Sequence, residues 1–402
     1  MDSLDTGRER FAASEQPTEA WTPQTHAREV PTCPGDRRRR WWPLAWPVAA
    51  VATLGLAVAL PGAGQAKTFS CDAGDVTCLI DAINQANANG EQNTIRLQAG
   101  TYPLTAPNND ENGLPVITSR LTITGEGAET TIIERDASAP AFPGFRFFMV
   151  AESGTLSLER LTLRGGGSLS GLTGGGAISN SGTLTVTRST ITDNKTSGGG
   201  AGIFNRGTAT IANSTLAHND GLFESGALTN DGTMVITATT FADNSADGAS
   251  AILNGGTLTV TNSTFTDNIT TGSGAGAVMN FGTLGVSNTT FARNMAGGFF
   301  CPPGAAISNG GTLVLTQSTL ADNVVSEAVG SALLSARGAT TILQNTLIAR
   351  NVEQSPFDPS GTRGGPDCRG VVTSFGNNLI GDTTGCTIIR PPGVRDLTGD
   401  PG

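Results

Sequence analysis

The sequence is poor in aromatic and imidazole side chains. Its 402 residues include 4 Trp, 1 Tyr and 2 His, and all four Trp lie within the first 46 residues. Beyond residue 66 the chain has no Trp, one Tyr, Tyr102, and one His, His218. A Ser-His-Asp triad would have to use His218, and a metal site with several His ligands is excluded in one copy. Sugar-binding clefts usually rely on aromatic faces, so this shortage also argues against such a cleft.

Positive charge is scarce as well. The chain has 24 basic against 34 acidic side chains and a formal net charge of −10. Residues 1–66 contain equal numbers of the two kinds, so the remainder carries the same net charge. Phosphate repulsion would dominate any contact with a nucleic acid, so we expect none as a partner.

The first 66 residues have the pattern of an export leader. A polar stretch ends in the run Arg37–Arg40, residues 41–60 carry no charge, and small residues lead to Ala66. This pattern predicts a secretory signal with a long N-terminal region, cleaved after Ala66. An uncleaved membrane anchor is the alternative, because an uncharged run of this length spans a bilayer. We expect export, to the medium or the cell surface, with membrane contact only through an uncleaved leader.

Five cysteines follow the leader. Cys71 and Cys78 form one close pair, Cys368 and Cys386 form another, and Cys301 is left over. In an exported chain the two pairs are candidates for disulfides, although sequence alone does not fix the connectivity. Metal binding is the alternative, but neither pair has the two-residue spacing of a zinc site.

A gapless repeat occupies the middle of the chain. Segments such as GTLTVTRSTITDN and GTLTVTNSTFTDN recur at steps of 24 to 29 residues. The first Thr of each falls at Thr183, Thr208, Thr233, Thr257, Thr283 and Thr312. Two apolar columns two residues apart alternate with Thr, as in a half-buried strand. A second strand follows each block, with Ile191, Leu216, Phe241, Phe265, Phe291 and Leu320 in one inward column, and a third precedes it.

Three short strands in each 25-residue unit, with Gly and Asn between them, indicate a parallel β-helix. One coil cannot bury its apolar face alone, so stability comes from stacked neighbours. We therefore predict an all-β fold, a right-handed single-stranded parallel β-helix of about ten coils with three short strands per coil. The handedness comes from the general chirality of parallel connections.

Two columns of Asn align at the turns between strands. Asn tolerates left-handed backbone geometry, and its amide can pair with the copies above and below. We therefore predict structural Asn ladders. One contains Asn180, Asn205, Asn230, Asn254, Asn280 and Asn309, and the other contains Asn194, Asn219, Asn244, Asn268, Asn294, Asn323 and Asn351.

The open end of a β-helix needs a cap. Apolar residues at helical spacing predict a helix over about 76–88, with Asp75 as N-cap and Gly90 just past the end. The predicted organisation is a signal peptide at 1–66, an N-terminal cap and first coil at 67–105, β-helix repeats at 106–351, and a C-terminal coil and tail at 352–402.

The blocks GGAI at 175–178 and FADN, FTDN and FARN at 241–244, 265–268 and 291–294 resemble the repeats of polymorphic outer membrane proteins. The segment around Leu79–Ile83 and Asn93–Tyr102 is similar to the CSLREA-type opening of bacterial exported β-helix proteins. The resemblance implies a β-helix that works at the cell surface, as an adhesin-like module. It also implies that the chain would normally continue past Gly402, so a truncated C-terminus is expected.

The column next to the second Asn ladder is the candidate for enzyme chemistry. It contains Asp193, His218, Asp243, Asp267, Arg293 and Asp322. Parallel β-helices also form polysaccharide lyases, which use acidic ligands for Ca²⁺ and a basic residue as proton acceptor. Asp243 and Asp267 are the candidate Ca²⁺ ligands, with Arg293 as base and His218 as a further acid or base. The alternative is that Asp at this turn caps local N–H groups and Arg293 screens the stack.

Outward Thr residues form unbroken ladders at the first-Thr positions given above and at a second set. That second set contains Thr190, Thr215, Thr240, Thr264, Thr290 and Thr319. Flat Thr arrays are typical of ice-binding solenoids, but β-branched Thr also simply suits an exposed strand.

The sequence therefore predicts an exported, non-enzymatic surface or secreted β-helix that adheres to extracellular polysaccharide or a cell-surface ligand. No catalytic residue and no cofactor other than a possible Ca²⁺ is assigned. A polysaccharide lyase or hydrolase is the alternative, and an ice- or mineral-binding solenoid is the third interpretation.

Overall fold

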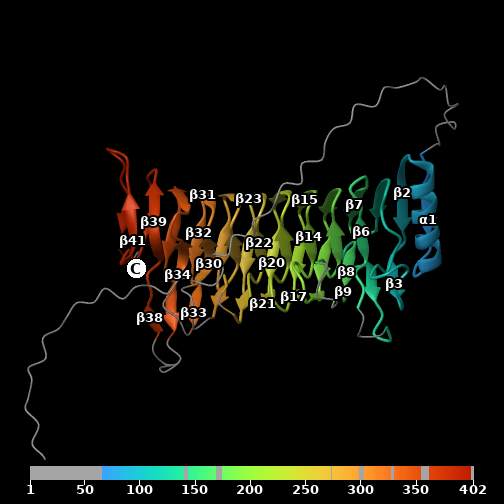
Figure 1. Cartoon of the computed structure of the whole chain (residues 1–402), viewed down its shortest axis with the longest axis horizontal. Helices are drawn as coiled ribbons and strands as arrows, with labels where there is room; N and C mark the ends of the chain where they lie inside the picture. Colours follow the sequence, from blue (N-terminus) through green and yellow to red (C-terminus); the bar gives the residue numbers. More distant parts are fainter. Residues whose placement is uncertain are drawn as a thin grey trace, which may run out of the picture. The chain divides into compact units, whose positions relative to one another are not determined.

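The computed structural model describes residues 66–139, 144–168, 174–272, 274–297, 303–326, 330–354 and 362–399. The export leader before Ala66 and Cys301, which the predicted pairs leave over, lie outside these residues. The leader therefore stays a prediction. Within them the chain winds through stacked coils in sequence order, from helix α1 at one end to strand β41 at the other (Figure 1). No helix in this part of the chain is long and apolar enough to cross a membrane.

Helix α1 (Val76–Asn89) covers the first coil, as predicted. The Asp75 side chain accepts the N–H of Cys78 at 2.9 Å, and Gly90 ends the helix at φ 69°. Its buried face consists of Leu79, Ala82, Ile83 and Ala86. The apolar side chains of one helix face thus cover the end of the core beside β2 (Gln92–Leu97) (Figure 1).

One coil shows how the repeat folds. It consists of β10 (Ile178–Asn180), β11 (Thr183–Thr187), β12 (Thr190–Thr192) and β13 (Lys195–Thr196). β10 and β11 enter one sheet of 21 strands, here sheet 1, while β12 and β13 enter sheets of 12 and 9 strands, here sheets 2 and 3. The three-sheeted, right-handed parallel β-helix of about ten coils is therefore confirmed. The two-residue strands of sheet 3 were not foreseen.

Sheet 1 receives a five-residue strand from most coils. These strands are β4 (Arg120–Thr124), β7 (Thr155–Glu159), β11, β15 (Thr208–Ala212), β19 (Thr233–Thr237), β23 (Thr257–Thr261), β27 (Thr283–Ser287), β31 (Thr312–Thr316) and β35 (Thr340–Gln344). From β7 onward, each of these strands follows another strand of sheet 1. These preceding strands are β6 (Phe148–Val150), β10, β14 (Ile203–Asn205), β18 (Leu228–Asn230), β22 (Ile252–Asn254), β26 (Val278–Asn280), β30 (Gly304–Asn309) and β34 (Ser331–Ser335). The ends of the sheet are formed by β1 (Thr68–Cys71), β2, β39 (Cys368–Ser374) and β41 (Gly385–Ile389).

Sheets 2 and 3 follow the corners of the coil. Sheet 2 contains β3 (Gly100–Leu104), β5 (Thr131–Arg135), β8 (Thr162–Arg164), β12, β16 (Thr215–Ala217), β20 (Thr240–Ala242), β24 (Thr264–Thr266), β28 (Thr290–Ala292), β32 (Thr319–Ala321), β36 (Leu347–Ala349), β40 (Leu379–Ile380) and β42 (Leu397–Thr398). Sheet 3 contains β9 (Gly167–Ser168), β13, β17 (Asp220–Gly221), β21 (Ser245–Ala246), β25 (Ile269–Thr270), β29 (Met295–Ala296), β33 (Val324–Ser326), β37 (Val352–Gln354) and β38 (Thr362–Gly364).

The strand register matches the aligned repeats. Thr183 lies opposite Thr208 and Thr208 opposite Thr233, so equal repeat positions pair across successive coils. All strand pairings in the described chain are parallel except that of β37 with β38. The inward columns are fully buried, and Phe241, Phe265 and Phe291 stack with ring centroids 4.7 and 4.6 Å apart. The aliphatic and aromatic columns together form one continuous core.

Close packing of successive coils explains why a glycine precedes each first Thr of the repeat. A Cβ at Gly207 would collide with the main-chain carbonyl of Gly182 in the preceding coil, and Gly232 meets Gly207 in the same way. At this corner the coils approach too closely for any side chain.

Both predicted Asn ladders form. In the first, each Nδ2 from Asn180 to Asn280 donates to the Oδ1 of the next member at 2.7 to 2.8 Å. In the second, the distances from Asn194 to Asn351 are 2.8 to 3.0 Å. The side-chain amides are buried, and each provides a hydrogen-bond partner to a neighbouring amide that water does not reach.

A hydroxyl ladder at the corner between sheets 1 and 2 was missed by the sequence analysis. Ser189, Ser214, Ser263, Thr289 and Ser318 accept a main-chain N–H from the preceding coil. Each of these hydroxyls donates to the carbonyl two residues before it, such as Thr187 for Ser189. The short hydroxyl side chains of this column thus provide hydrogen-bond partners for main-chain groups at the corner of each coil.

Carboxylates terminate the polar columns at the C-terminal end. Asp367 accepts the Nδ2 of Asn351 at 2.7 Å and the N–H of Asp382 at 2.7 Å. Burial raises the pKa of Asp367, against the hydrogen bonds that lower it. Asp396 accepts a hydrogen bond from Asn378 Nδ2 at 3.0 Å. The Oδ1 of Asn378 in turn accepts the N–H of Thr346 in the preceding coil.

Both predicted cysteine pairs lie at disulfide distance. Cys71 and Cys78 join β1 to α1 with a Cα–Cα distance of 5.6 Å. Cys368 and Cys386 join β39 to β41 at the same distance. The two links lie at opposite ends of the stack, where the end coils have a neighbour on one side only.

Removing one ladder amide tests the contribution of the Asn columns. Asn244→Ala would leave the N–H and Nδ2 of Asn219 and the carbonyl of Leu216 without their partner. We expect a loss of about 2–3 kcal/mol, because buried polar groups would go unsatisfied. Urea unfolding of the variant measures it. Asn84→Ala, on the exposed face of α1, is the control and should change stability by less than about 0.5 kcal/mol. Equal losses in the two variants would contradict the role of the ladder.

The Asp396 column predicts a pH dependence. Burial alone would raise the pKa of Asp396, but hydrogen bonds from Arg390, Ser374 and Asn378 outweigh it and lower the pKa. A carboxyl with a lowered pKa contributes stability above its unfolded value of about 3.9, and this is lost as the pH falls through the folded value. We therefore expect Asp396→Asn to be less stable than the parent at pH 7, with the difference shrinking below about pH 4. Thermal unfolding at both pH values tests this, and a constant difference would refute it.

Candidate functional site

The column proposed for enzyme chemistry lies at the corner between sheets 2 and 3. Its members all have left-handed backbone geometry, with φ between 53° and 59°: Asp193, His218, Asp243, Asp267, Arg293, Asp322 and Arg350. Each directly precedes an Asn of the second ladder. The turn excludes β-branched residues and favours short polar ones, so its backbone accounts for the frequency of Asp here.

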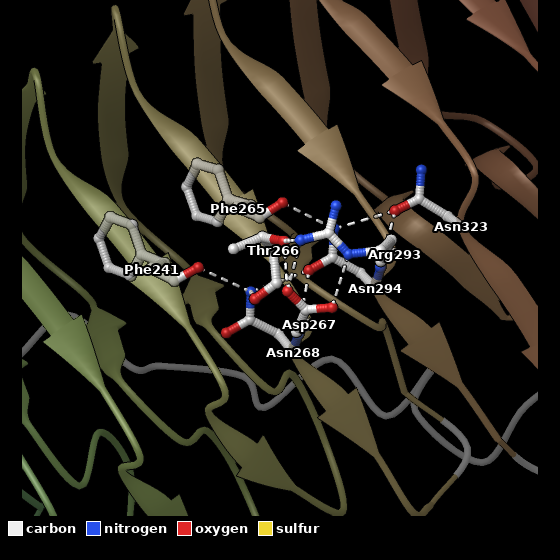
Figure 2. Close-up of polar contacts among 8 residues, drawn as sticks. All are labelled: Phe241, Phe265, Thr266, Asp267, Asn268, Arg293, Asn294 and Asn323. Carbon is white, nitrogen blue, oxygen red and sulfur yellow. Dashed lines mark hydrogen bonds and ion pairs between the residues drawn. The ribbon is translucent and has the colours of Figure 1, made fainter.

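Asp267 and Arg293 form a bidentate ion pair across adjacent coils (Figure 2). Arg293 Nε donates to Asp267 Oδ1 at 2.9 Å and Nη2 donates to Oδ2 at 2.8 Å. The Thr266 hydroxyl donates to Asp267 Oδ2 at 2.6 Å and accepts Arg293 Nη2 at 2.7 Å. The hydrogen bonds from Arg293 hold the pKa of Asp267 below its usual range. The carboxylate therefore stays ionised and occupied by this partner.

The same pair affects the proposed lyase chemistry. The hydrogen bond with Asp267 raises the pKa of Arg293, which keeps its proton and is a poor base. Asp243 lies exposed in the coil before Asp267, and the described ranges contain no group of three or more His, Cys, Asp or Glu suited to a metal ion. A Ca²⁺ site at Asp243 and Asp267 remains a prediction that would require displacing Arg293.

The other members of the column are exposed. Asp322 pairs with Arg350 at 2.6 Å, with both side chains about half exposed. Asp193 accepts the hydroxyl of Thr192 at 3.0 Å, so the bond is to a side chain and not to the local N–H groups we expected. His218 is exposed at φ 53°. These contacts stabilise the turn and do not converge on a point in space.

The outward side of sheet 1 is a different kind of surface. We call the outward side chains of β11, β15, β19, β23, β27 and β31 the threonine face. These are Thr183, Thr185, Thr187, Thr208, Thr210, Ala212, Thr233, Val235, Thr237, Thr257, Thr259, Thr261, Thr283, Gly285, Ser287, Thr312, Val314 and Thr316. None is charged, although charged residues make up 14% of the chain. The face spans six consecutive coils in register.

An open hollow of about 560 Å³ lies at the N-terminal end of this sheet. Its lining includes Ser70, Arg96, Gln98, Thr124, Glu126 and Arg160. The last row of the threonine face, which starts at Thr187, runs into the hollow through Glu159, Thr124, Arg96 and Ser70. The hollow could not be predicted from the sequence because these coils lack the clear repeat, and only the strand register reveals the shared row.

One family model agrees with the fold. The family model described as "Right handed beta helix region" matches residues 174–347. A search of curated proteins finds no match. Among solved structures, the chain is similar to the A-module of the mannuronan C-5 epimerase AlgE6 of Azotobacter vinelandii. The identity is 15% and the TM-score 0.44, over 82% of this chain and 94% of that one.

The ion pair yields a test of its own. Arg293→Gln should raise the pKa of Asp267 toward its ordinary value, because the hydrogen bonds that lower it are lost. Carboxyl NMR titration measures the change, and the loss of stability should be small for so exposed a pair. Arg350→Gln is the matched control, since it breaks the equivalent pair with Asp322 and should leave Asp267 unchanged. An unaltered titration of Asp267 in Arg293→Gln would contradict the assignment.

Proposed function

We propose that this protein is an exported, non-enzymatic β-helix that binds extracellular polysaccharide along the threonine face. The observation that carries the proposal is the uncharged, hydroxyl-rich surface that continues through six coils of sheet 1. The propensity of Thr for strands explains why Thr occurs there. It does not explain the lack of charge, because exposed strands commonly carry Lys and Glu.

The chemistry of this surface suits the hydroxyl groups of a sugar polymer. Each Thr hydroxyl both donates and accepts a hydrogen bond, and its methyl group offers a small apolar contact. Because no charge lies on the face, a sugar chain laid across it desolvates no ion. Equal positions repeat at the strand spacing of about 4.8 Å, so an extended polymer meets the same groups coil after coil.

Many weak contacts replace a deep cleft in this proposal. The threonine face contains no aromatic side chain, so aromatic stacking is not the source of affinity there. A repeated surface gains affinity by multivalency, since each further contact on a held polymer is intramolecular. We therefore expect affinity to rise with the length of the sugar chain.

Export is the setting that the proposal requires. Two disulfide-distance cysteine pairs suit an oxidising compartment, and the leader-like sequence before Ala66 suits secretion. The resemblance of the repeats to outer membrane protein repeats supports work at a cell surface.

Binding is favoured over cleavage by the contacts of the candidate residues. Asp267 is held by Arg293, and Arg293 keeps its proton. Ice binding would use the same face, but Val235, Gly285 and Val314 interrupt its middle row. Purified protein should therefore show no thermal hysteresis.

Two lysines placed on the threonine face test the proposal. We expect Thr210→Lys with Thr259→Lys to weaken polysaccharide binding at least about tenfold, because bulk and charge would break the flat neutral surface. Retention on cellulose, xylan, galactan and polygalacturonate with Ca²⁺ measures binding, and the chain length of each polymer reports cleavage.

The control carries the same substitutions on another face. Thr215→Lys with Thr264→Lys adds equal charge to the outward side of sheet 2 and should retain binding. Equal loss in both variants, or no binding to any polymer by the parent, would refute the face as the site. Shortening of any polymer by the parent would refute the non-enzymatic function.

A further inference from the structure

Arg96 is the one cation in its row of sheet 1. It is exposed on β2, between Ser70 on β1 and Thr124 on β4. Its neighbours on both strands are therefore small and neutral. Glu159, one strand further along, forms an ion pair with Arg188 instead. Nothing charged in the row neutralises the Arg96 guanidinium.

Arg160 enters the same hollow from the corner after β7. Its backbone has φ 55°, and its Nη2 donates to the main-chain carbonyl of Glu126, not to the carboxylate. Gly125 occupies the intervening coil, where a Cβ would collide with the carbonyl of Arg160. The two coils therefore approach too closely at this corner of the hollow for a side chain at position 125.

Neither arginine of this hollow forms an ion pair with a carboxylate among the described residues. Seven basic side chains of the described residues form ion pairs with carboxylates, and Arg96 and Arg160 are not among them. In a chain with a net charge of −10, the hollow brings these two guanidinium groups together, with Glu126 as the acidic residue of its lining. Gln98 lines the same hollow and donates its side-chain amide to Asp72 at 2.9 Å.

We infer that this hollow binds the carboxylate of an acidic sugar unit, at the end of the row along which the polymer lies. The inference rests on the proposed function for its polymer and adds the class of sugar. Arg presents a planar fork of donors that matches a carboxylate, and Ser70 and Thr124 supply hydroxyls beside it. The overall negative charge repels polyanions, so recognition would be confined to this hollow and would weaken with salt.

The test compares one oligosaccharide in two forms. Oligogalacturonate and the same oligosaccharide with its carboxyl groups reduced to alcohols are titrated calorimetrically into the parent, Arg96→Gln and Arg160→Gln. Arg337→Gln, exposed in the turn between β34 and β35, is the control with the same loss of charge. Circular dichroism and thermal unfolding establish that each variant is folded.

The parent should bind the acidic form about tenfold more tightly than the reduced form, as expected of one charge-assisted Arg–carboxylate contact. Each hollow variant should lose most of this preference and keep its affinity for the reduced form, while Arg337→Gln keeps both. Equal binding of the two forms by the parent, or a preference that survives in both hollow variants, overturns the inference.

Failure of the proposed function has a different signature. If the threonine face binds no polymer, neither oligosaccharide form responds to Thr210→Lys with Thr259→Lys. Galacturonate monosaccharide then tests the hollow alone. Binding that Arg96→Gln abolishes supports the carboxylate site, and no binding by the parent refutes it.

Discussion

The structure depends on a single constraint, that every amide buried at a turn must find its partner in the next coil. An Asn side chain offers a donor and an acceptor in opposite directions, so one residue satisfies the coil before it and the coil after it. A coil shifted by one residue would lose these bonds and turn its apolar columns outward. The ladders thus set the register in which Leu184, Ile191 and their repeats meet.

Because the interior fixes the register, the outward positions are free to differ. The corner beside the second ladder carries exposed ion pairs such as Asp267 with Arg293. These pairs contribute little to stability and do not form a ligand site. The outward side of sheet 1 is uniform and uncharged over six coils, and its N-terminal end is marked by Arg96. Polarity is therefore arranged along the stack and not gathered in a cleft, which fits contact with a polymer better than turnover of a small substrate.

Repetition explains which parts could be predicted from the sequence. Thr183 and Asn180 recur in fixed columns, so strands, register, core and ladders followed from alignment, and helical spacing gave α1. The strands of sheet 3 were missed because Lys195, Asp220, Ser245 and Ile269 occupy one column without sharing a residue type, so the repeat shows no pattern there. The hollow was missed because Arg96 and Arg160 lie in early coils whose residues diverge from the repeat and meet only across strands.

The ladders also give the stack a direction. Every Nδ2 donates toward the C-terminal neighbour, so the amide dipoles align in series, like the peptide dipoles of a helix. The carboxylate of Asp367 lies at the positive end of the second series. At the opposite end of the first ladder, the position of Asn180 is taken by Val150 in the preceding coil. The Oδ1 of Asn180 is therefore left without a donor among the described residues. Coils in the middle of the Asn ladders are consequently interchangeable, whereas the coils at the two ends are not. Whole coils can therefore be duplicated or deleted only between the end coils.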